Sequence, residues 1–208
     1  MKSKGFAILG LWLFTLGLAF ATDAPKLMIE KASTRIFDEL KKDRIQQKGG
    51  KQALFQLVGE VVLPHFDFAK MSRLVIKRKY WRKASADSQQ AFVLAFRDHL
   101  VRTYTTALVQ FDIEKIVYLP AKQRKGKNEV TVQTRVHLAR TKPLAIDYRL
   151  YLNKQGEWKV FDIKIDGISL IISNRYGYNK IIKQSGIPSL TKILSTNKYA
   201  PLVLTHTG

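Results

Sequence analysis

Few residues of this 208-residue chain are placed for acid–base chemistry. Asp162 and Asp166 stand four residues apart in a stretch of aromatic and β-branched residues, where a carboxylate on a sheet face could act as a general base. The same aspartates could instead cap a turn or pair with a cation such as Arg149. His65 lies close to Asp67, but the sequence offers no third group to complete a catalytic set. An interpretation without catalytic residues is therefore favoured over an enzyme.

Metal and thiol chemistry has still less support. The chain contains no cysteine, which removes disulfides, thiol nucleophiles and cysteine-ligated metal sites together. Nucleotide-binding glycine motifs and the G-x-S-x-G nucleophile elbow are also missing. The four histidines form neither an H-x-x-x-H nor an H-E-x-x-H pair; they are His65, His99, His137 and His206. We therefore expect no metal and no cofactor.

The apolar residues divide the chain into helices followed by strands. Helical spacing recurs in four segments, namely residues 27–40, 51–63, 66–76 and 89–110. An alternation of period two follows in four more, namely residues 111–119, 129–138, 144–152 and 157–166. Asp67 and Ser85 are expected to cap helices, and helical spacing returns from Ile168. This order predicts an α+β fold in which helices gather on one face of a curled, four-stranded antiparallel sheet.

The last of these strands is apolar on both of its faces. Trp158 and Val160 alternate to one side, whereas Phe161, Ile163 and Ile165 alternate to the other. A strand of this kind must be covered on two sides. One cover can be a packed helix, and the identity of the second cover decides the function.

The N-terminus is typical of an export signal. Two lysines precede an apolar run from Phe6 to Leu18, and Ala19-Phe20-Ala21 supplies the small-x-small pattern of a signal peptidase site. We expect residues 1–21 to be a cleaved signal peptide and residues 22–194 to form a single domain. Residues 195–208 show no strong period and are expected to be a loosely ordered tail.

The formal net charge of +20 makes the surface strongly basic. In a cytoplasmic protein this charge would suggest nucleic acid, but an exported protein meets anionic lipid headgroups first. One group of cations surrounds two aromatic residues and could bind a headgroup or a partner protein; it comprises Lys77, Arg78, Lys79 and Arg82. The same segment also fits a solvated loop between helices. A module that binds partners through its basic surface is therefore one alternative function.

Four segments together carry a resemblance to a known family. They are V-L-P-H-F-D-F-A-K-M-S-R-L-V (62–75), F-R-D-H-L-V-R-T-Y-T-T-A-L (96–108), I-D-Y-R-L (146–150) and G-E-W-K-V-F-D-I-K-I-D-G-I-S-L (156–170). In order and spacing, the chain from residue 28 to residue 194 resembles the MlaC family, also called the toluene-tolerance or organic-solvent-resistance family. The basic run at 77–79, the lysine-rich turn at 122–127 and the tail after Ser195 depart from the family pattern, which affects docking surfaces more than cargo.

The resemblance implies a soluble periplasmic phospholipid carrier. The family fold is similar to the nuclear-transport-factor-like curled sheet, whose helices and sheet enclose a deep hydrophobic cavity. Members ferry glycerophospholipids between an outer-membrane lipoprotein–porin complex and an inner-membrane MCE-protein/ABC transporter complex, which maintains the lipid asymmetry of the outer membrane. The resemblance implies no catalysis, no metal and no nucleic acid; phospholipid is the cargo, and a monomer is expected.

Enclosing the tails of a phospholipid requires a large apolar interior. Exposing a methylene group to water costs about 0.8 kcal/mol, so two acyl chains with about 30 methylenes would cost about 24 kcal/mol. We therefore expect a cavity of about 1,000 Å³ or more. An enzyme on the same fold, acting on a small apolar substrate, would instead require Asp162 or His137 to point into this cavity. Alternation and helix stripes predict lining residues, each of which could also be ordinary core: Met71, Leu74, Val75, Leu100, Tyr104, Val132, Val136, Ile146, Tyr148, Val160, Ile163, Ile168, Leu170 and Ile171.

Overall fold

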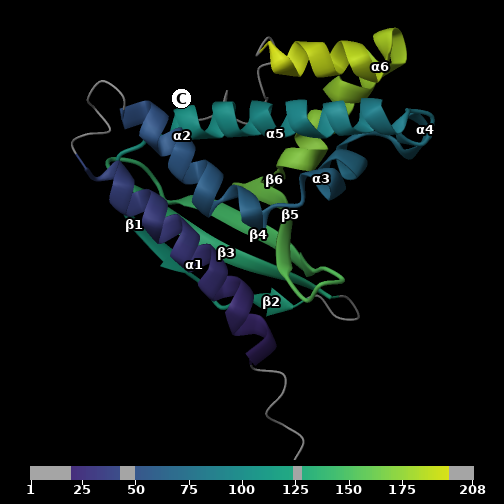
Figure 1. Ribbon diagram of the computed structural model, residues 1–208. Coiled ribbons are helices and arrows are strands. Elements are labelled where there is room, and N and C mark those ends of the chain that lie inside the picture. Colours follow the sequence, from purple (N-terminus) through teal and green to yellow (C-terminus); the bar gives the residue numbers. More distant parts are fainter. Residues whose placement is uncertain (1–19, 43–49, 124–127, 197–208) are drawn as a thin grey trace, which may run out of the picture.

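The computed structural model describes residues 20–42, 50–123 and 128–196 (Figure 1). It has the predicted α+β organisation, with helices first and an antiparallel sheet after them. The helical elements before the sheet are α1 (Phe20–Leu40), α2 (Gly50–Val61), the 3-10 turn η2 (Leu63–His65), α3 (Phe68–Val75), α4 (Arg78–Trp81) and α5 (Ala86–Leu108). They are followed by β1 (Ile113–Tyr118), β2 (Lys122–Gln123), β3 (Glu129–Leu138), β4 (Leu144–Leu152), β5 (Trp158–Ile165), β6 (Ile168–Ser169) and α6 (Leu170–Ser195). Most of the predicted signal peptide and tail lies outside the described residues.

The described sheet has six strands, so the predicted count of four is wrong. Strands β1, β3, β4, β5 and β6 are neighbours in that order, and β2 pairs with β3. The four predicted strands correspond to β1, β3, β4 and β5. The two additional strands contain two residues each, which is too short for an alternating pattern to be visible in a sequence.

Alternation is clearest in β3, where the prediction is confirmed. Val130, Val132, Thr134 and Val136 are buried, whereas the residues between them are partly exposed. These buried side chains define the inner face of the sheet. Helix α1 crosses this face and contacts β1 and β3, with Ile29 packed into the cluster around Val130 and Val132 (Figure 1).

A β-bulge in β5 overturns the alternation expected for that strand. The register between β4 and β5 skips Phe161, which is the extra residue of the bulge. Val160 and Ile163, predicted on opposite faces, therefore both lie on the inner face and share one apolar cluster. Phe161 lies on the outer face and packs edge-on against Tyr151, with the ring centroids 5.8 Å apart.

Among the helices whose starts are described, α3, α5 and α6 each begin at a side-chain cap. Asp67, Ser85 and Ser169 each accept a hydrogen bond from the backbone N–H three residues later, at 2.7, 3.2 and 3.2 Å. These bonds satisfy amide donors that lack a partner inside the first turn. The predictions for Asp67 and Ser85 are confirmed, and Ser169 sets the point where the short strand β6 becomes α6.

Helix α6 changes direction at Gly186, about two thirds of the way along its 26 residues. Gly186 has a φ of 77°, which favours glycine, and Pro188 has no backbone donor to continue the helical ladder. Beyond this break the last part of α6 lies along α5 (Figure 1).

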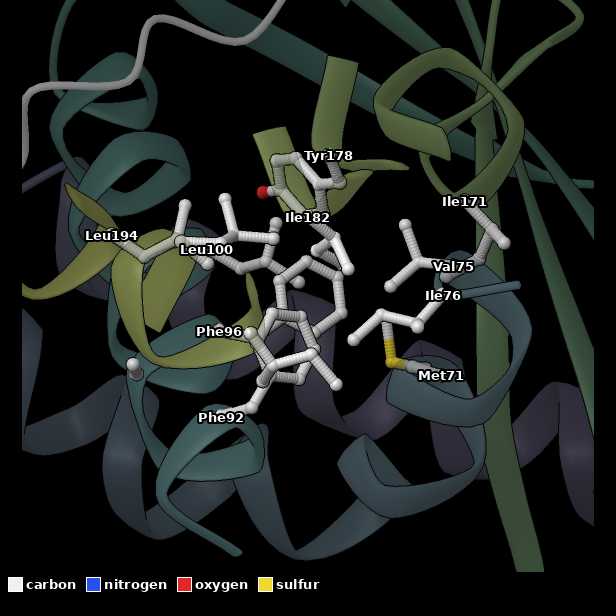
Figure 2. Close-up of a cluster of buried hydrophobic side chains, with 13 residues drawn as sticks. Met71, Val75, Ile76, Phe92, Phe96, Leu100, Ile171, Tyr178, Ile182 and Leu194 are labelled. Carbon is white, nitrogen blue, oxygen red and sulfur yellow. The ribbon is translucent and has the colours of Figure 1, made fainter. Parts of the chain in front are cut away.

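The largest apolar cluster lies between α3, α5 and α6, and we call it the helical core (Figure 2). Phe92 and Phe96 stack with their ring centroids 5.7 Å apart, and Tyr178 meets them edge-on at 6.4 and 5.9 Å. All three side chains are fully buried. The buried residues of the helical core are Met71, Val75, Ile76, Phe92, Ala95, Phe96, Leu100, Ile171, Tyr178, Ile182, Ile187, Leu190 and Leu194.

Candidate functional site

An apolar cavity of about 270 Å³ lies between the inner face of the sheet and the helices α1, α2 and α5. Each of the four long strands contributes an aliphatic wall, represented by Ile116, Val136, Ile146 and Ile163. The volume is smaller than the predicted value of about 1,000 Å³ and lies near the lower end of ordinary ligand pockets. Side chains of α1 and α2 line the cavity opposite the sheet, and these helices were not part of the predicted lining set.

Polar groups are rare in the cavity wall. None of the described lining residues is an aspartate, glutamate, lysine or arginine. Burial raises the pKa of Tyr104 and of Tyr148, so both phenols stay neutral at every physiological pH. The hydroxyl of Tyr104 is buried and has no hydrogen-bond partner among the described residues. The wall can therefore hold an apolar molecule, and the buried Tyr104 hydroxyl is available to a polar atom of that molecule.

His65 is the one titratable imidazole that lines the cavity within the described chain. Burial, together with the nearby Lys159 ammonium, lowers the pKa of His65 below its usual value of 6.5. The neighbouring Asp67 is engaged elsewhere, because its carboxylate accepts hydrogen bonds from the Lys70 amide and from the Tyr151 hydroxyl. Burial and this bond to Asp67 raise the pKa of Tyr151 to about 12. Asp67 thus acts as a cap and a bridge between α3 and β4.

Eight of the fourteen predicted residues line the cavity. They are Met71, Leu100, Tyr104, Val136, Ile146, Tyr148, Ile163 and Leu170. Each points from α3, α5, the inner face of the sheet or the start of α6 toward the same space. Sequence alternation found the strand positions, because the inner face of β3 and β4 is apolar in this region except at Thr134.

The other six predicted residues do not line the cavity. Val75 and Ile171 are buried in the helical core, and Leu74 packs against it (Figure 2). Val132 and Val160 are buried in the neighbouring cluster on the inner face. Ile168 is 49% exposed on β6. A helix stripe shows that one face of a helix is apolar, but it does not show whether that face turns toward the sheet or toward another helix. For this reason Leu74, Val75 and Ile171 were predicted in the cavity wall although they belong to or pack against the helical core.

Helices α1 and α2 supply lining residues that the sequence prediction missed. Ile36 and Phe37 of α1 and Val58 of α2 belong to the cavity wall. The sequence contained a signal for these residues, because both segments have an apolar face at helical spacing, and such a face must be covered by another part of the protein.

The basic residues proposed for docking lie away from the cavity. Lys77, Arg78, Lys79 and Arg82 are exposed around α4 and do not line it. The aromatic residues between them serve the interior instead: Tyr80 and Trp81 pack against the helical core, and the Trp81 ring meets Phe92 edge-on at 6.3 Å.

The carboxylate of Asp162 is buried on the outer side of β5, where neighbouring side chains bind it. It is 2% exposed, and the Ser169 hydroxyl donates to its two carboxylate oxygens at distances of 2.9 and 2.8 Å. Arg149 lies 3.4 Å from the same carboxylate, so the predicted arginine partner is confirmed. Neither Asp162 nor His137 lines the cavity, which is the position that an enzyme mechanism would require.

Two further features bear on the class of site. In the described ranges, no cluster of three or more histidine, aspartate or glutamate side chains is arranged to hold a metal ion. Over the same ranges, no helix combines the length and apolar character needed to cross a bilayer.

The family comparison fits this geometry. The sequence model of the MlaC protein family matches residues 30–196, which include every cavity-forming element except the first part of α1. The chain belongs to the MlaC family. The resemblance in the four sequence segments is therefore confirmed.

Relatives in this family carry names related to lipids and solvents. The toluene tolerance protein Ttg2D of Pseudomonas putida is 28% identical over 153 residues, which cover 74% of this chain and 70% of the relative. The intermembrane phospholipid transport system binding protein MlaC of Haemophilus influenzae is 21% identical over 187 residues, covering 89% of this chain and 87% of the relative. A solved structure of a phospholipid-binding protein from Ralstonia solanacearum, in complex with a phospholipid, is similar with a TM-score of 0.71 and 28% identity; the match covers 83% of this chain and 95% of that one.

Proposed function

We propose that this MlaC-family protein is a periplasmic phospholipid carrier and that the cavity between the sheet and α1, α2 and α5 holds the acyl chains. The observation that carries the proposal is the cavity wall itself, which is mainly aliphatic and aromatic and has no acidic or basic side chain other than His65 among the described residues. A ligand that fits such a wall is apolar over most of its surface. The phospholipid bound to the Ralstonia solanacearum protein supports this ligand class.

The cavity volume of about 270 Å³ adds a condition to the proposal. Two acyl chains left in water would cost about 24 kcal/mol, so a carrier must enclose them nearly completely. We propose that α1 and α2 move away from the inner face as the chains enter, with the headgroup kept in solvent. The curled, nuclear-transport-factor-like form of the sheet would provide the fixed wall against which these helices move.

The wider role follows from the family and remains part of the proposal. Residues 1–21 would direct export and be removed, which places the mature protein in the periplasm. The carrier would exchange glycerophospholipid with an outer-membrane lipoprotein–porin complex and an inner-membrane MCE-protein/ABC transporter complex, and so maintain outer-membrane asymmetry. The exposed cations around α4 are our candidates for docking to one of these complexes.

Lipid extraction from the purified mature protein tests this proposal. We expect co-purifying phospholipid, and we expect lipid-free protein to take up phospholipid from vesicles. An absence of both would overturn the carrier. The substitution Asp162→Asn distinguishes the carrier from the enzyme alternative. If the variant folds, as checked by circular dichroism, a carrier keeps its bound lipid. An enzyme would lose an activity while its lipid content stays unchanged.

A further inference from the structure

An unusual group of exposed apolar side chains lies where β6 becomes α6. Ile168 is 49% exposed, Ile172 67% and Tyr176 80%. The spacing of four residues places Ile172 and Tyr176 on one face of the helix, and Ile168 precedes this face in β6. Single exposed apolar residues are common on protein surfaces, but three large ones in nine consecutive positions form a stripe that needs an explanation. We call these three residues the α6 stripe.

Cations lie beside the helical part of the α6 stripe, whereas exposed Asp166 precedes Ile168. Arg175, Lys180 and Lys183 are exposed on the same helix, and α6 contains no aspartate or glutamate over its whole length. The chain at Lys77 adjoins this helix, because the Lys77 amide donates a hydrogen bond of 2.8 Å to the Asn179 side chain. Exposed aliphatic and aromatic residues beside lysine and arginine are the combination that binds the surface of an anionic bilayer.

The α6 stripe lies next to the cavity. Ile168 pairs with Ile165 in the ladder between β6 and β5, and Ile165 lines the cavity. Leu170, at the first turn of α6, lines it as well. A lipid leaving a bilayer at the α6 stripe would therefore meet the cavity wall within one strand pair and one helical turn.

We propose that the α6 stripe and its cations form a surface that binds an anionic phospholipid bilayer directly. Ile172 and Tyr176 enter the headgroup layer, and Arg175, Lys180 and Lys183 lie over the lipid phosphates. A second copy of this chain fits the surface less well, because a symmetric contact would bring the same cations together. The binding surface stands on its own observations; its use for lipid exchange rests on the proposed carrier function.

Vesicle co-sedimentation of the mature protein tests this surface. Vesicles of phosphatidylcholine alone are compared with vesicles that also contain phosphatidylglycerol, at low and high salt. We expect the double variant Ile172→Ser/Tyr176→Ser to lower the affinity for anionic vesicles by about tenfold or more, because two side chains no longer transfer to an apolar layer. The double variant Lys180→Gln/Lys183→Gln should weaken binding on anionic vesicles at low salt and have little effect at high salt, where charges are screened.

Matched controls come from the same chain. Leu94 on α5 is 40% exposed, and Leu94→Ser should leave vesicle binding unchanged. Lys142 and Lys154 are exposed in the turns that flank β4, and Lys142→Gln/Lys154→Gln should have a smaller effect than the α6 pair. Equal vesicle binding by the wild type and the Ile172→Ser/Tyr176→Ser variant would overturn the proposal. So would sedimentation velocity showing that this variant loses a self-association while its vesicle binding is unchanged.

Lipid content, measured in parallel, separates this proposal from the carrier function. Protein that retains extractable phospholipid but binds no vesicles overturns the surface and leaves the carrier standing. Protein that binds anionic vesicles through the α6 stripe but neither contains nor takes up phospholipid supports the surface and overturns the carrier.

Discussion

The helical core and the cavity are two apolar regions that share a wall but are packed differently. Met71 and Leu100 belong to both. On one side of them, the stacked rings of Phe92 and Phe96 and the edge of Tyr178 fill the space between α3, α5 and α6 (Figure 2). On the other side, side chains of the sheet, aliphatic except for Tyr148, face α1 and α2 across a space of about 270 Å³. The same class of residue thus builds a filled core or leaves a cavity, depending on whether large rings interlock across the interface.

The largest expected effect is the loss of stability when a ring is truncated in the helical core, compared with truncation of a ring in the cavity wall. Phe96→Ala removes a fully buried ring from the helical core and should lower the free energy of unfolding by about 3–5 kcal/mol. Phe37→Ala removes a half-buried ring from the cavity wall, where neighbours already leave space, and should cost less than about 2 kcal/mol. Urea denaturation followed by circular dichroism measures both values. Equal losses would contradict the distinction between a filled and a hollow region.

The next largest effect on stability comes from adding a ring to the helical core or to the cavity wall. Ala95→Phe overpacks the helical core and should lower the free energy of unfolding by about 1–3 kcal/mol. Ala32→Phe places the same ring in the cavity wall on α1, where space exists, and should change stability by less than about 1 kcal/mol. Lipid uptake from vesicles should show the reverse order, with loss in Ala32→Phe and retention in Ala95→Phe. Retained uptake in Ala32→Phe would indicate that lipid binds elsewhere.

A smaller effect concerns the free hydroxyl in the cavity wall. Tyr104→Phe removes a buried oxygen that has no partner in the described part of the chain, so the free energy of unfolding should be unchanged or rise by up to about 1 kcal/mol. If the hydroxyl donates to an ester oxygen of the lipid, affinity should fall by about two- to tenfold. Denaturation and a fluorescent-lipid titration measure the two quantities. A clear loss of stability would instead reveal a structural partner for Tyr104.

The smallest effect is a pH dependence from His65. Because its pKa is lowered in the folded protein, the unfolded chain binds the proton more readily. The contribution of neutral His65 to stability is present above its usual pKa of 6.5 and is lost as the pH falls through the lower, folded-state pKa. His65→Gln should therefore flatten the decline in unfolding free energy between neutral and mildly acidic pH. An identical slope in the variant would assign that decline to other groups.

Local patterns predicted the fold well where a single period governed a segment. The alternation of Val130, Val132, Thr134 and Val136 placed one face of β3 correctly, and Asp67 marked the start of α3. The arrangement around Phe161 could not be predicted, because the bulge adds one residue to β5 and no residue type in this segment marks its position. The strands β2 and β6 were missed for a related reason, since pairs of residues carry no period.

The site was predicted less completely than the fold. Strand positions such as Val136 and Ile146 were found, because one side of an alternating strand must face the interior. Helix positions such as Val75 were misplaced, because the choice between sheet and neighbouring helix depends on how whole elements pack. The contribution of α1 to the cavity depends on the same long-range arrangement.

Native mass spectrometry of the wild-type protein and the Ala32→Phe variant, before and after incubation with phospholipid vesicles, tests the central claim most directly. We predict that the wild type carries one phospholipid per chain and that the variant, equally folded by circular dichroism, carries none. Equal occupancy in the two proteins would place lipid outside the cavity. No lipid in the wild type, even after incubation with vesicles, would contradict the carrier itself.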